Sequence, residues 1–499
     1  MGKTSCEIEF SVIDTTAKAD GTVVVNAKNQ ISDEQDLKKD KISAPQIATL
    51  ENNYWVLDGT LQIHDPDANP EYGWWSSSMT GADGSFPAAP TLTVSFNENH
   101  TTTGITFGFE GDSLPSSIVI KWYGASNTLL DSKTFTPDGY IYYCENQVEN
   151  FRKLVVTFPG MTKPDRYLKL SRIVYGQVMV FSGDDLLSAS IQEEADPISA
   201  EVSINTAEFT VHSKDDSFNI VNPSGIYVSL QQRQPAIIRE KVNGIWMEMG
   251  TYYLNEWENT SDNVITLKSV DAVGLLDSLT FPGGQWSGAT VSAILEAIFS
   301  GSNVPYSLDA SYSTATLSGR LEQCTKREAV QQVAFAIGAM VTTDRSDTVK
   351  IIPPDYTTKS TVPKTRKMTN QKLTLKPLVT GVEVTAHSFD SEGNDTQTVV
   401  GYYATDLPAN VAPNVLQITD ATLISTANAS AVAQRVYEYY QRRYKNELSI
   451  ITNAEQAGIG ATIESYYDKT VSGMVESMEI DLVGGFISKI ELVGEVDSE

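Results

Sequence analysis

The fold is decided by one stretch, TKREAVQQVAFAIGAMVTTDRSDTVKIIP, which runs from Thr325 to Pro353. Thr325 and Glu328 have the spacing of a capping box, in which each side chain accepts a hydrogen bond from the other residue's backbone N–H. Gly338 stands where a left-handed cap would end the helix. Two β-rich runs separated by a polar turn then predict a hairpin over residues 340–352. The face of this helix expected to be buried carries Val330, Val333, Ala334 and Ile337.

A second short helix is expected upstream, where Thr290 precedes an apolar stripe at helical spacing: Val291, Ile294, Leu295, Ile298 and Phe299. Before it, residues 250–277 predict two strands around a polar turn and then a short apolar tail. Two helices on a small sheet make a compact α+β piece without a catalytic motif. Because β-rich sequence flanks it on both sides, we expect it to hold two β-regions in register.

The length of the chain indicates several domains, and its charge argues against one class of function. A chain of 499 residues is too long for one core and is expected to form about three or four domains. Its 63 acidic against 36 basic residues give a net charge of −27, which disfavours binding to nucleic-acid phosphates. Two explanations of the acidity stay open. It provides solubility, or it lines a passage along which DNA slides without sticking.

Several kinds of site and segment are not indicated. Three widely spaced cysteines (Cys6, Cys144 and Cys324) argue against a disulfide scaffold and against a thiolate metal site. The four histidines are scattered, and the motifs of zinc helices, phosphate loops and nucleophile elbows are missing. Neither a signal peptide nor an apolar run of ~18 residues is found. We therefore expect a soluble protein, made in the cytoplasm, that is not an enzyme.

Residues 45–178 consist of short strands rich in Trp, Tyr, Phe and Thr with recurrent turn signals, which is typical of a β-sandwich. Four pieces resemble the galactose-binding-like jelly rolls of the discoidin type: VLDGT (Val56–Thr60), YGWWSSS (Tyr72–Ser78), LTVSF (Leu92–Phe96) and RYLKLSRIVYG (Arg166–Gly176). The resemblance implies a platform for a glycan or another surface ligand, made by loops at one end of the sandwich.

The candidate glycan-binding residues are Tyr72, Trp74 and Trp75, because an exposed aromatic face suits the apolar face of a sugar ring. The alternative is that tryptophan fills the core, and strand alternation would let only one of Trp74 and Trp75 point inward. Such domains often hold a structural calcium ion. The nearby carboxylates of Asp58, Asp65 and Asp67 do not follow the ligand order of an EF-hand, so no cofactor is expected.

Strands are also expected on both sides of the α+β piece. One capped helix, TANASAVAQRVYEYYQRRYKN, carries Val432, Val436 and Tyr439 on one face, and its C-terminal Arg442, Arg443 and Lys445 suit the helix dipole. The arm at the N-terminus predicts a strand, a hairpin turn at Asp20-Gly21 and pairing with a later sheet. The expected domains are a β arm and linker (1–44), the sandwich (45–178), a first hub β-barrel domain (179–280), a small α+β domain (281–365) and a second hub β-barrel domain with one helix (366–499).

The order of these pieces over residues 180–499 is similar to the baseplate hub and tail-associated proteins of tailed bacteriophages. The resemblance is carried by MGTYY (Met249–Tyr253) with Trp257 and VDAVGLLD, the two helices and hairpin, AQRVYEYYQRR, and the final GMVESMEIDL strands. It implies a mainly β, multidomain fold with two tube-like β-barrel domains in each subunit. It also implies a homotrimer that closes a ring matching a tail tube, next to a distal tail protein.

The function expected from this resemblance is that of a structural component of a phage or prophage virion, at the tail tip. The hub would close the tail tube and pass DNA without binding it specifically. The sandwich is an addition to the minimal hub and suggests host attachment through a cell-wall glycan. The alternative is a host-surface glycan-binding adhesin, in which the sandwich is the main functional part.

Overall fold

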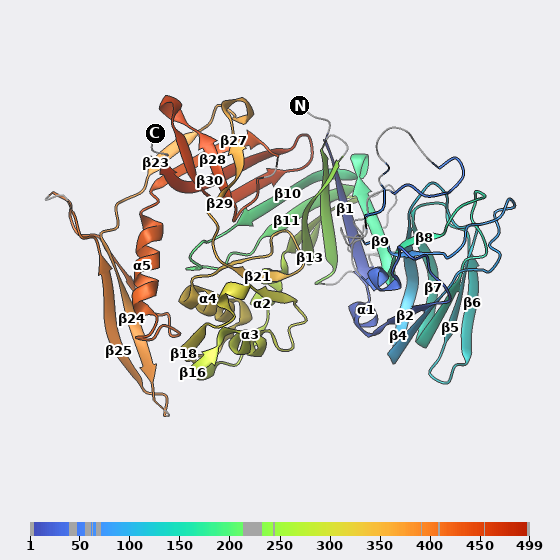
Figure 1. The fold of residues 1–499 in the computed structure, drawn as a ribbon, viewed down its shortest axis with the longest axis horizontal. Helices are drawn as coiled ribbons and strands as arrows, with labels where there is room; N and C mark the ends of the chain where they lie inside the picture. Colours follow the sequence, from blue (N-terminus) through green and yellow to red (C-terminus); the bar gives the residue numbers. More distant parts are fainter. Residues whose placement is uncertain are drawn as a thin grey trace. The chain divides into compact units, whose positions relative to one another are not determined.

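The computed structural model describes residues 4–38, 47–54, 61, 63–65, 71–212, 232–242, 245–390, 392–407, 410–453 and 455–496. Over these residues the chain is mainly β and forms several sheets (Figure 1). It divides into two compact units, one of residues 10–179 and one that joins residues 1–9 to residues 180–499. None of the helices in the described ranges is long and apolar enough to cross a membrane.

The unit of residues 10–179 is built on a seven-stranded sheet with antiparallel pairing. Its strands are β2 (Thr22–Val25), β3 (Trp74–Trp75), β4 (Thr91–Phe109), β5 (Ile118–Tyr123), β6 (Leu129–Phe135), β7 (Ile141–Thr157) and β8 (Lys169–Val174). The order is β3-β8-β4-β7-β5-β6, and β2 pairs with β4. Large side chains fill its core, among them Trp74, Phe107, Trp122, Phe151 and Phe158. The VLDGT piece of the predicted jelly roll lies outside the described residues.

The expectation for the N-terminal arm was wrong in one respect. No hairpin turn forms at Asp20-Gly21, because residues Thr15–Asp20 form the short helix α1. The Asp14 carboxylate accepts from the N–H groups of Thr16 and Ala17, which caps the first turn and favours a helix there.

The other unit contains most of a 13-stranded sheet. Its strands are β1 (Thr4–Ile13), β9 (Gly176–Ser182), β10 (Leu186–Glu194), β11 (Thr206–His212), β12 (Pro235–Val242), β13 (Ile245–Ser261), β14 (Val264–Val270), β22 (Thr358–Val362), β23 (Lys372–Leu375), β27 (Tyr444–Ile451), β28 (Gly460–Glu464), β29 (Thr470–Asp481) and β30 (Ile487–Val496). The order is β23-β27-β30-β29-β10-β11-β14-β13-β12-β1-β9, and β28 pairs with β29 and β22.

The two β-regions that flank the α+β piece are therefore joined into one sheet. The junction is the antiparallel pairing of β10 with β29, in which Ser190–Glu194 lie opposite Ser477–Asp481. The sequence predicts two β-barrel domains here. Among the described strands, the hydrogen-bonded order is a path with one branch that passes from one region into the other. The barrel arrangement stays a prediction.

The α+β piece follows the sequence prediction closely. Its elements are α2 (Ala272–Asp277), β15 (Thr280–Phe281), β16 (Gly284–Thr290), α3 (Val291–Phe299), β17 (Tyr306–Leu308), β18 (Thr316–Leu321), β19 (Cys324–Thr325), α4 (Lys326–Ile337), β20 (Met340–Thr342) and β21 (Val349–Ile352). The capping box of Thr325 and Glu328 is formed, Gly338 is left-handed with φ 80°, and the Thr290 side chain caps α3. The predicted hairpin is confirmed as the antiparallel pair β20 and β21.

The last small sheet has the order β25-β24-β26 and is formed by β24 (Gly381–Phe389), β25 (Asp395–Tyr403) and β26 (Val415–Ile418). Figure 1 shows α5 (Ala429–Tyr440) lying along β24 and β25. Val432 and Val436 of α5 are buried as expected, but the Asn428 side chain does not cap the helix. It accepts instead from the N–H of Ser425, in the turn that leads into α5.

Candidate functional site

The aromatic residues predicted to bind a glycan are all buried. The exposed fractions are 1% for Tyr72, 0% for Trp74 and 4% for Trp75. Trp74 lies in the main core, where its ring centroid is 6.1 Å from that of Phe158. Trp75 points to the other side of β3 and packs with Tyr72 and Ile47 in a second small core. The expectation that only one tryptophan points inward was wrong, because both sides of this two-residue strand are covered.

Hydrogen bonds also turn these aromatic groups inward. The indole N–H of Trp74 donates to the Ala27 carbonyl at 3.0 Å, and that of Trp75 donates to the Tyr72 carbonyl at 3.1 Å. The Tyr72 hydroxyl is 3.2 Å from Nδ1 of His64. The rings of Tyr72, Trp74 and Trp75 have no exposed face, so the structure offers no platform on which a sugar could stack at these residues.

A buried ion pair lies against the same aromatic cluster. Lys169 Nζ is 2.5 Å from Glu51 Oε2, and both side chains are almost fully buried. The ammonium group also lies 4.0 Å from the ring centroid of Tyr54 and 4.6 Å from that of Trp75. Burial lowers the pKa of Lys169, and the Glu51 carboxylate opposes that shift. The contacts of this lysine are thus internal to the unit of residues 10–179.

A second ion pair ties neighbouring loops of the same unit together. Arg166 donates to both carboxylate oxygens of Asp112, at 2.6 and 3.0 Å, and to the Asn52 carbonyl at 2.7 Å. The hydrogen bond from Arg166 is the main reason that the pKa of Asp112 falls to about 2. Asp65 is described and Asp58 and Asp67 are not. Within the described ranges, no cluster of three or more His, Cys, Asp or Glu residues is placed to hold a metal ion.

In the larger unit, the hairpin turn between β20 and β21 makes a buried polar contact with β10. Arg345 is left-handed, with φ 58°, and its guanidinium reaches β10. It donates from Nε to Glu193 Oε1 at 2.6 Å and from Nη2 to Glu193 Oε2 at 3.0 Å. Nη2 also donates to the Glu455 carbonyl at 3.1 Å. The turn of the α+β piece is thus fastened to the strand that joins the two β-regions.

Glu455 continues this network toward the second β-region. Its carboxylate accepts from Arg366 at 2.6 and 3.2 Å, from the Ser360 hydroxyl at 2.5 Å and from the Asn453 N–H at 2.8 Å. Burial opposes ionisation here, but the hydrogen bonds from Arg366 and Ser360 hold the pKa of Glu455 below its ordinary value. We call the set Glu193, Arg345, Glu455 and Arg366 the latch.

The latch was missed from the sequence. Arg345 stood out only as one of several polar residues in a predicted turn, and its partner Glu193 is 152 residues away. The basic run Arg442, Arg443 and Lys445 has internal partners, as the dipole argument suggested. Arg442 donates to the Glu438 carbonyl at the end of α5, Arg443 to the Lys376 carbonyl, and Lys445 pairs with Glu491 at 2.6 Å.

One face of the large sheet is polar on both sides of the β10–β29 junction. Gln192 lies opposite Thr206 on β11 and opposite Glu479 on β29, so the face passes from one β-region to the other. The intervening residues, such as Ile191 and Ile480, are buried on the opposite face. The acidic side chains of this polar face are Glu194, Glu208, Glu256, Glu258, Glu447, Glu479, Asp481 and Glu491, and the basic ones are Lys268, Lys372, Lys445 and Lys489.

Each lysine of the polar face lies beside a carboxylate of the same face. The N–O distances are 3.1 Å for Lys268 and Glu258, 3.0 Å for Lys372 and Glu447, 2.6 Å for Lys445 and Glu491, and 2.8 Å for Lys489 and Glu479. The remaining acidic groups give the face an excess of negative charge. Such a surface repels phosphate groups at distances within the Debye length.

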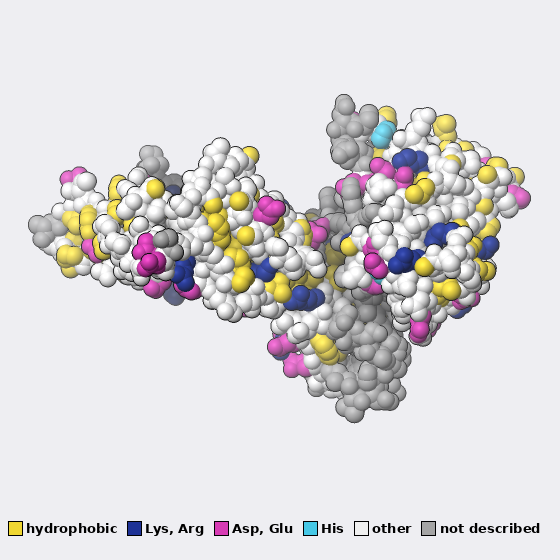
Figure 2. Space-filling view, turned by 90° about the horizontal axis from the view of Figure 1, so that it is seen from below, with side chains coloured by type: hydrophobic (Ala, Val, Ile, Leu, Met, Phe, Trp, Pro, Cys, Tyr) yellow, Lys and Arg dark blue, Asp and Glu magenta, His cyan; other side chains and the backbone are white. Residues whose placement is uncertain are grey.

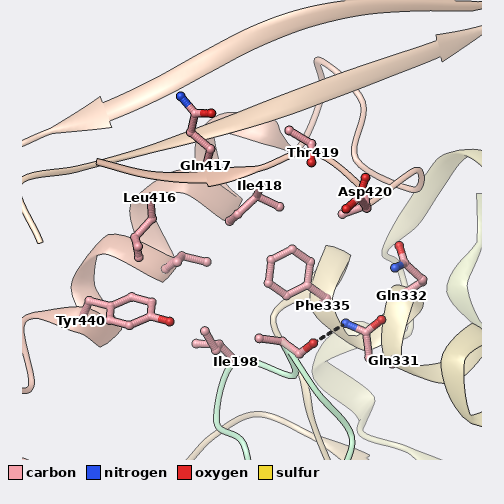
Figure 3. Close-up of a pocket in the computed structure, with 13 residues that line it drawn as sticks. Ile198, Gln331, Gln332, Phe335, Leu416, Gln417, Ile418, Thr419, Asp420 and Tyr440 are labelled. Carbon is pink, nitrogen blue, oxygen red and sulfur yellow. Dashed lines mark hydrogen bonds between the residues drawn. The ribbon is translucent and has the colours of Figure 1, made fainter. Parts of the chain in front are cut away.

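A groove of about 340 Å³ lies between β26, α4 and α5. Figure 3 shows the side chains of Leu416, Ile418, Phe335 and Tyr440 directed into it. On one wall, Gln331 donates to the Ala200 carbonyl at 3.1 Å. The lining is mostly apolar or uncharged, with Asp420 as its one charged residue, which suits an uncharged ligand or polypeptide segment.

Comparison with known proteins gives only distant structural likenesses. No protein-family model matches the chain. No curated protein sequence matches it either. The 43 kDa tail protein of prophage MuSo2 from Shewanella oneidensis has 11% identity and a TM-score of 0.45, with 63% of this chain and 96% of that chain covered.

Two further solved structures are tail proteins of the same kind. A tail protein from Neisseria meningitidis has 11% identity and a TM-score of 0.43, covering 64% of this chain and 94% of that one. A prophage tail protein from Listeria monocytogenes has 10% identity and a TM-score of 0.43, covering 64% and 92%.

Proposed function

We propose that this chain is a structural component of a phage or prophage tail tip, a baseplate hub whose copies form a ring around a passage for DNA. The observation that carries the proposal is the polar face, which runs without a break from one β-region to the other through the β10–β29 pairing. A subunit that lines a passage needs such a hydrated face on one side of a rigid sheet. The ring would contain three copies and would join the tail tube and a distal tail protein.

The charge of the polar face suits this role. Affinity for DNA comes from lysine and arginine side chains that displace counterions from phosphates. Here every lysine of the face already has a carboxylate partner, and further carboxylates remain. DNA would therefore meet a hydrated, net negative wall and would move along it without being held.

Rigidity is supplied by the latch and by the α+β piece. Arg345 and Arg366 connect the hairpin turn, β10 and the segment before β28, and these elements come from both β-regions. Breaking a buried ion pair by removing one partner costs about 3 to 5 kcal/mol, so the register of the two regions is strongly held. The role is mechanical, and we assign no catalytic residue.

Charge reversal on the polar face tests the proposal. In phage or prophage particles that carry Glu208→Lys and Glu256→Lys together, tails are expected to assemble but DNA delivery to be slowed, because new cations would hold phosphates. Glu98→Lys, exposed in the sandwich, is the matched control. If labelling locates the protein along the tail or away from the particles, and not at the tail tip, the proposal is contradicted. Unchanged DNA delivery by the double variant would mean that the polar face does not line a passage for DNA.

A further inference from the structure

The three-stranded sheet β25-β24-β26 has an open edge on each side. Among the described residues, β25 pairs only with β24, and β26 pairs only with β24. An edge strand presents unpaired backbone N–H and C=O groups to any strand that can lie beside it. Because both open edges belong to the same sheet, one edge in the first copy can pair with the opposite edge in a second copy.

The β25 edge lacks the devices that normally protect an edge strand. It is nine residues long and pairs with β24 in unbroken register from Asp395 to Tyr403. From Gln397 to Ala404 it carries no charged residue and no proline. Val399 is 62% exposed and Tyr403 is 50% exposed. Figure 2 shows hydrophobic side chains at the surface of this part of the molecule, at the left of the view. Such a strand is expected to be covered in the assembled protein.

The β26 edge provides a matching surface. It borders the apolar groove of about 340 Å³ described above, and residues 410–419 carry no charge. In a chain with a net charge of −27, two copies repel each other over most of their surface. Residues 397–404 and 410–419 carry no charged side chain, so pairing through them avoids the repulsion that other surfaces would suffer.

We propose that β25 of one copy adds to the free edge of β26 of the next copy and closes the mouth of the groove. The contact is heterologous, because two different surfaces meet, and contacts of this type generate rings when the rotation between copies closes. Backbone hydrogen bonds supply the affinity and the apolar groove supplies the specificity. This inference rests on the proposed ring and deepens it by naming the surfaces that join its subunits.

Register within the sheet identifies residues for a cross-linking test. Glu383 pairs with Gln417 of β26, and Thr385 pairs with Val399 of β25. Since Glu383 and Thr385 are two residues apart on β24, Gln417 and Val399 lie on the same face. In a sheet that continues from copy to copy, cysteines at such positions come within the Cα separation of about 4.4 to 6.8 Å that a disulfide needs.

The experiment uses full-length protein with Cys324→Ser, which removes the one native cysteine that is not buried. Gln417→Cys is combined in turn with Gln397→Cys, Val399→Cys and Gly401→Cys, so that three registers on that face are sampled. Under mild oxidation, at least one combination is expected to give covalent species of two and three copies on a denaturing gel. Gln417→Cys with Glu258→Cys on the polar face is the control and should give none.

Each other outcome has a defined meaning. Dimers formed by Val399→Cys alone would show that two β25 edges pair with each other and would overturn the inference. No cross-link from any combination, in a protein that still sediments as a trimer, would overturn this interface and leave the proposed hub standing. A monomeric protein without cross-links would overturn both. Covalent ladders beyond three copies would support the pairing but contradict a closed ring of three.

Discussion

The unit of residues 10–179 and the larger unit use buried charge in different ways. In the first, Lys169 at the start of β8 and Arg166 just before it bind carboxylates of neighbouring segments, beside an aromatic cluster. In the larger unit, Arg345 and Arg366 fasten a helical piece to two β-regions that are far apart in sequence. The contacts of Lys169 and Arg166 lie within one unit. Those of Arg345 and Arg366 connect the two β-regions, and among the described residues a polar face and two strand edges are left exposed. The surfaces that we propose for assembly thus lie where sequence motifs are scarce.

The strongest expected effect on the unit of residues 10–179 comes from the core residue Trp74. Trp74→Ala should lower the free energy of unfolding by about 3 to 5 kcal/mol, because it removes a fully buried ring and leaves a cavity. Thermal unfolding followed by tryptophan fluorescence measures this. Leu130→Ala, half-exposed on β6, is the control and should change little. If the Trp74→Ala protein is stable but no longer binds host-wall polysaccharide, the result would support the hypothesis of a glycan platform.

The latch is expected to have the largest effect on the framework. Arg345→Ala leaves the buried Glu193 carboxylate without its partner, and we expect a loss of about 3 kcal/mol in unfolding free energy. Lys350→Ala removes an exposed partner of Asp344 in the same hairpin and should cost below about 1 kcal/mol. Denaturant unfolding compares the two. Equal small losses would mean that the hairpin turn does not hold the two regions together.

The pH dependence of the larger unit is expected to involve Glu476. Burial raises the pKa of this carboxyl to about 7, and its side chain accepts from the Tyr439 hydroxyl at 2.9 Å. A raised pKa means that the folded state favours the protonated form, so the contribution to stability is complete below pH 4.5 and is lost as the pH rises through about 7. Asp196, Lys376 and Glu491 also act on this group.

Glu476→Gln should remove this loss, because the amide stays neutral and still accepts a hydrogen bond. Compared with the wild type, we expect a gain of about 1 to 2 kcal/mol at pH 8 and little difference at pH 5. Unfolding curves at both pH values provide the measurement, and Glu495→Gln on the exposed end of β30 serves as control. A gain of the same size at pH 5 and pH 8 would exclude a titration effect.

The smallest effect is expected at the helix cap of the α+β piece. Thr325→Ala removes the side-chain acceptor of the Glu328 N–H and should cost about 1 kcal/mol. Thr325→Ser keeps that acceptor and should cost far less. If the two variants are equally stable, the capping box does not contribute to the start of α4.

The sequence predicted what depends on short spacings. The Thr325 and Glu328 capping box, the Gly338 cap and the β20–β21 hairpin are all confirmed, since each involves residues within about one turn or one loop of each other. The Trp74 and Trp75 pair was misjudged, because the segments that cover Trp75 come from elsewhere in the chain. Whether a tryptophan lies outside or inside depends on such covering segments, which strand alternation alone does not reveal.

The strand pairing that joins the two β-regions also could not be predicted from the sequence. Gln192 and Ser477, which are hydrogen-bonded across β10 and β29, are 285 residues apart. Nothing in the local pattern of either strand identifies its partner, because polar and apolar residues alternate in both as they do in many strands. The polar face depends on this pairing, and the latch joins residues that are also far apart in sequence, so neither could be predicted from the sequence.

The mass of the protein in solution tests the central claim most directly. Sedimentation or light scattering of the full chain, at concentrations up to those found in assembling tails, should give three copies of the 54.5 kDa chain. Val399→Lys, which places a charge on the β25 edge, should shift the population toward single copies. A wild-type protein that remains a single copy over the whole concentration range would contradict the account.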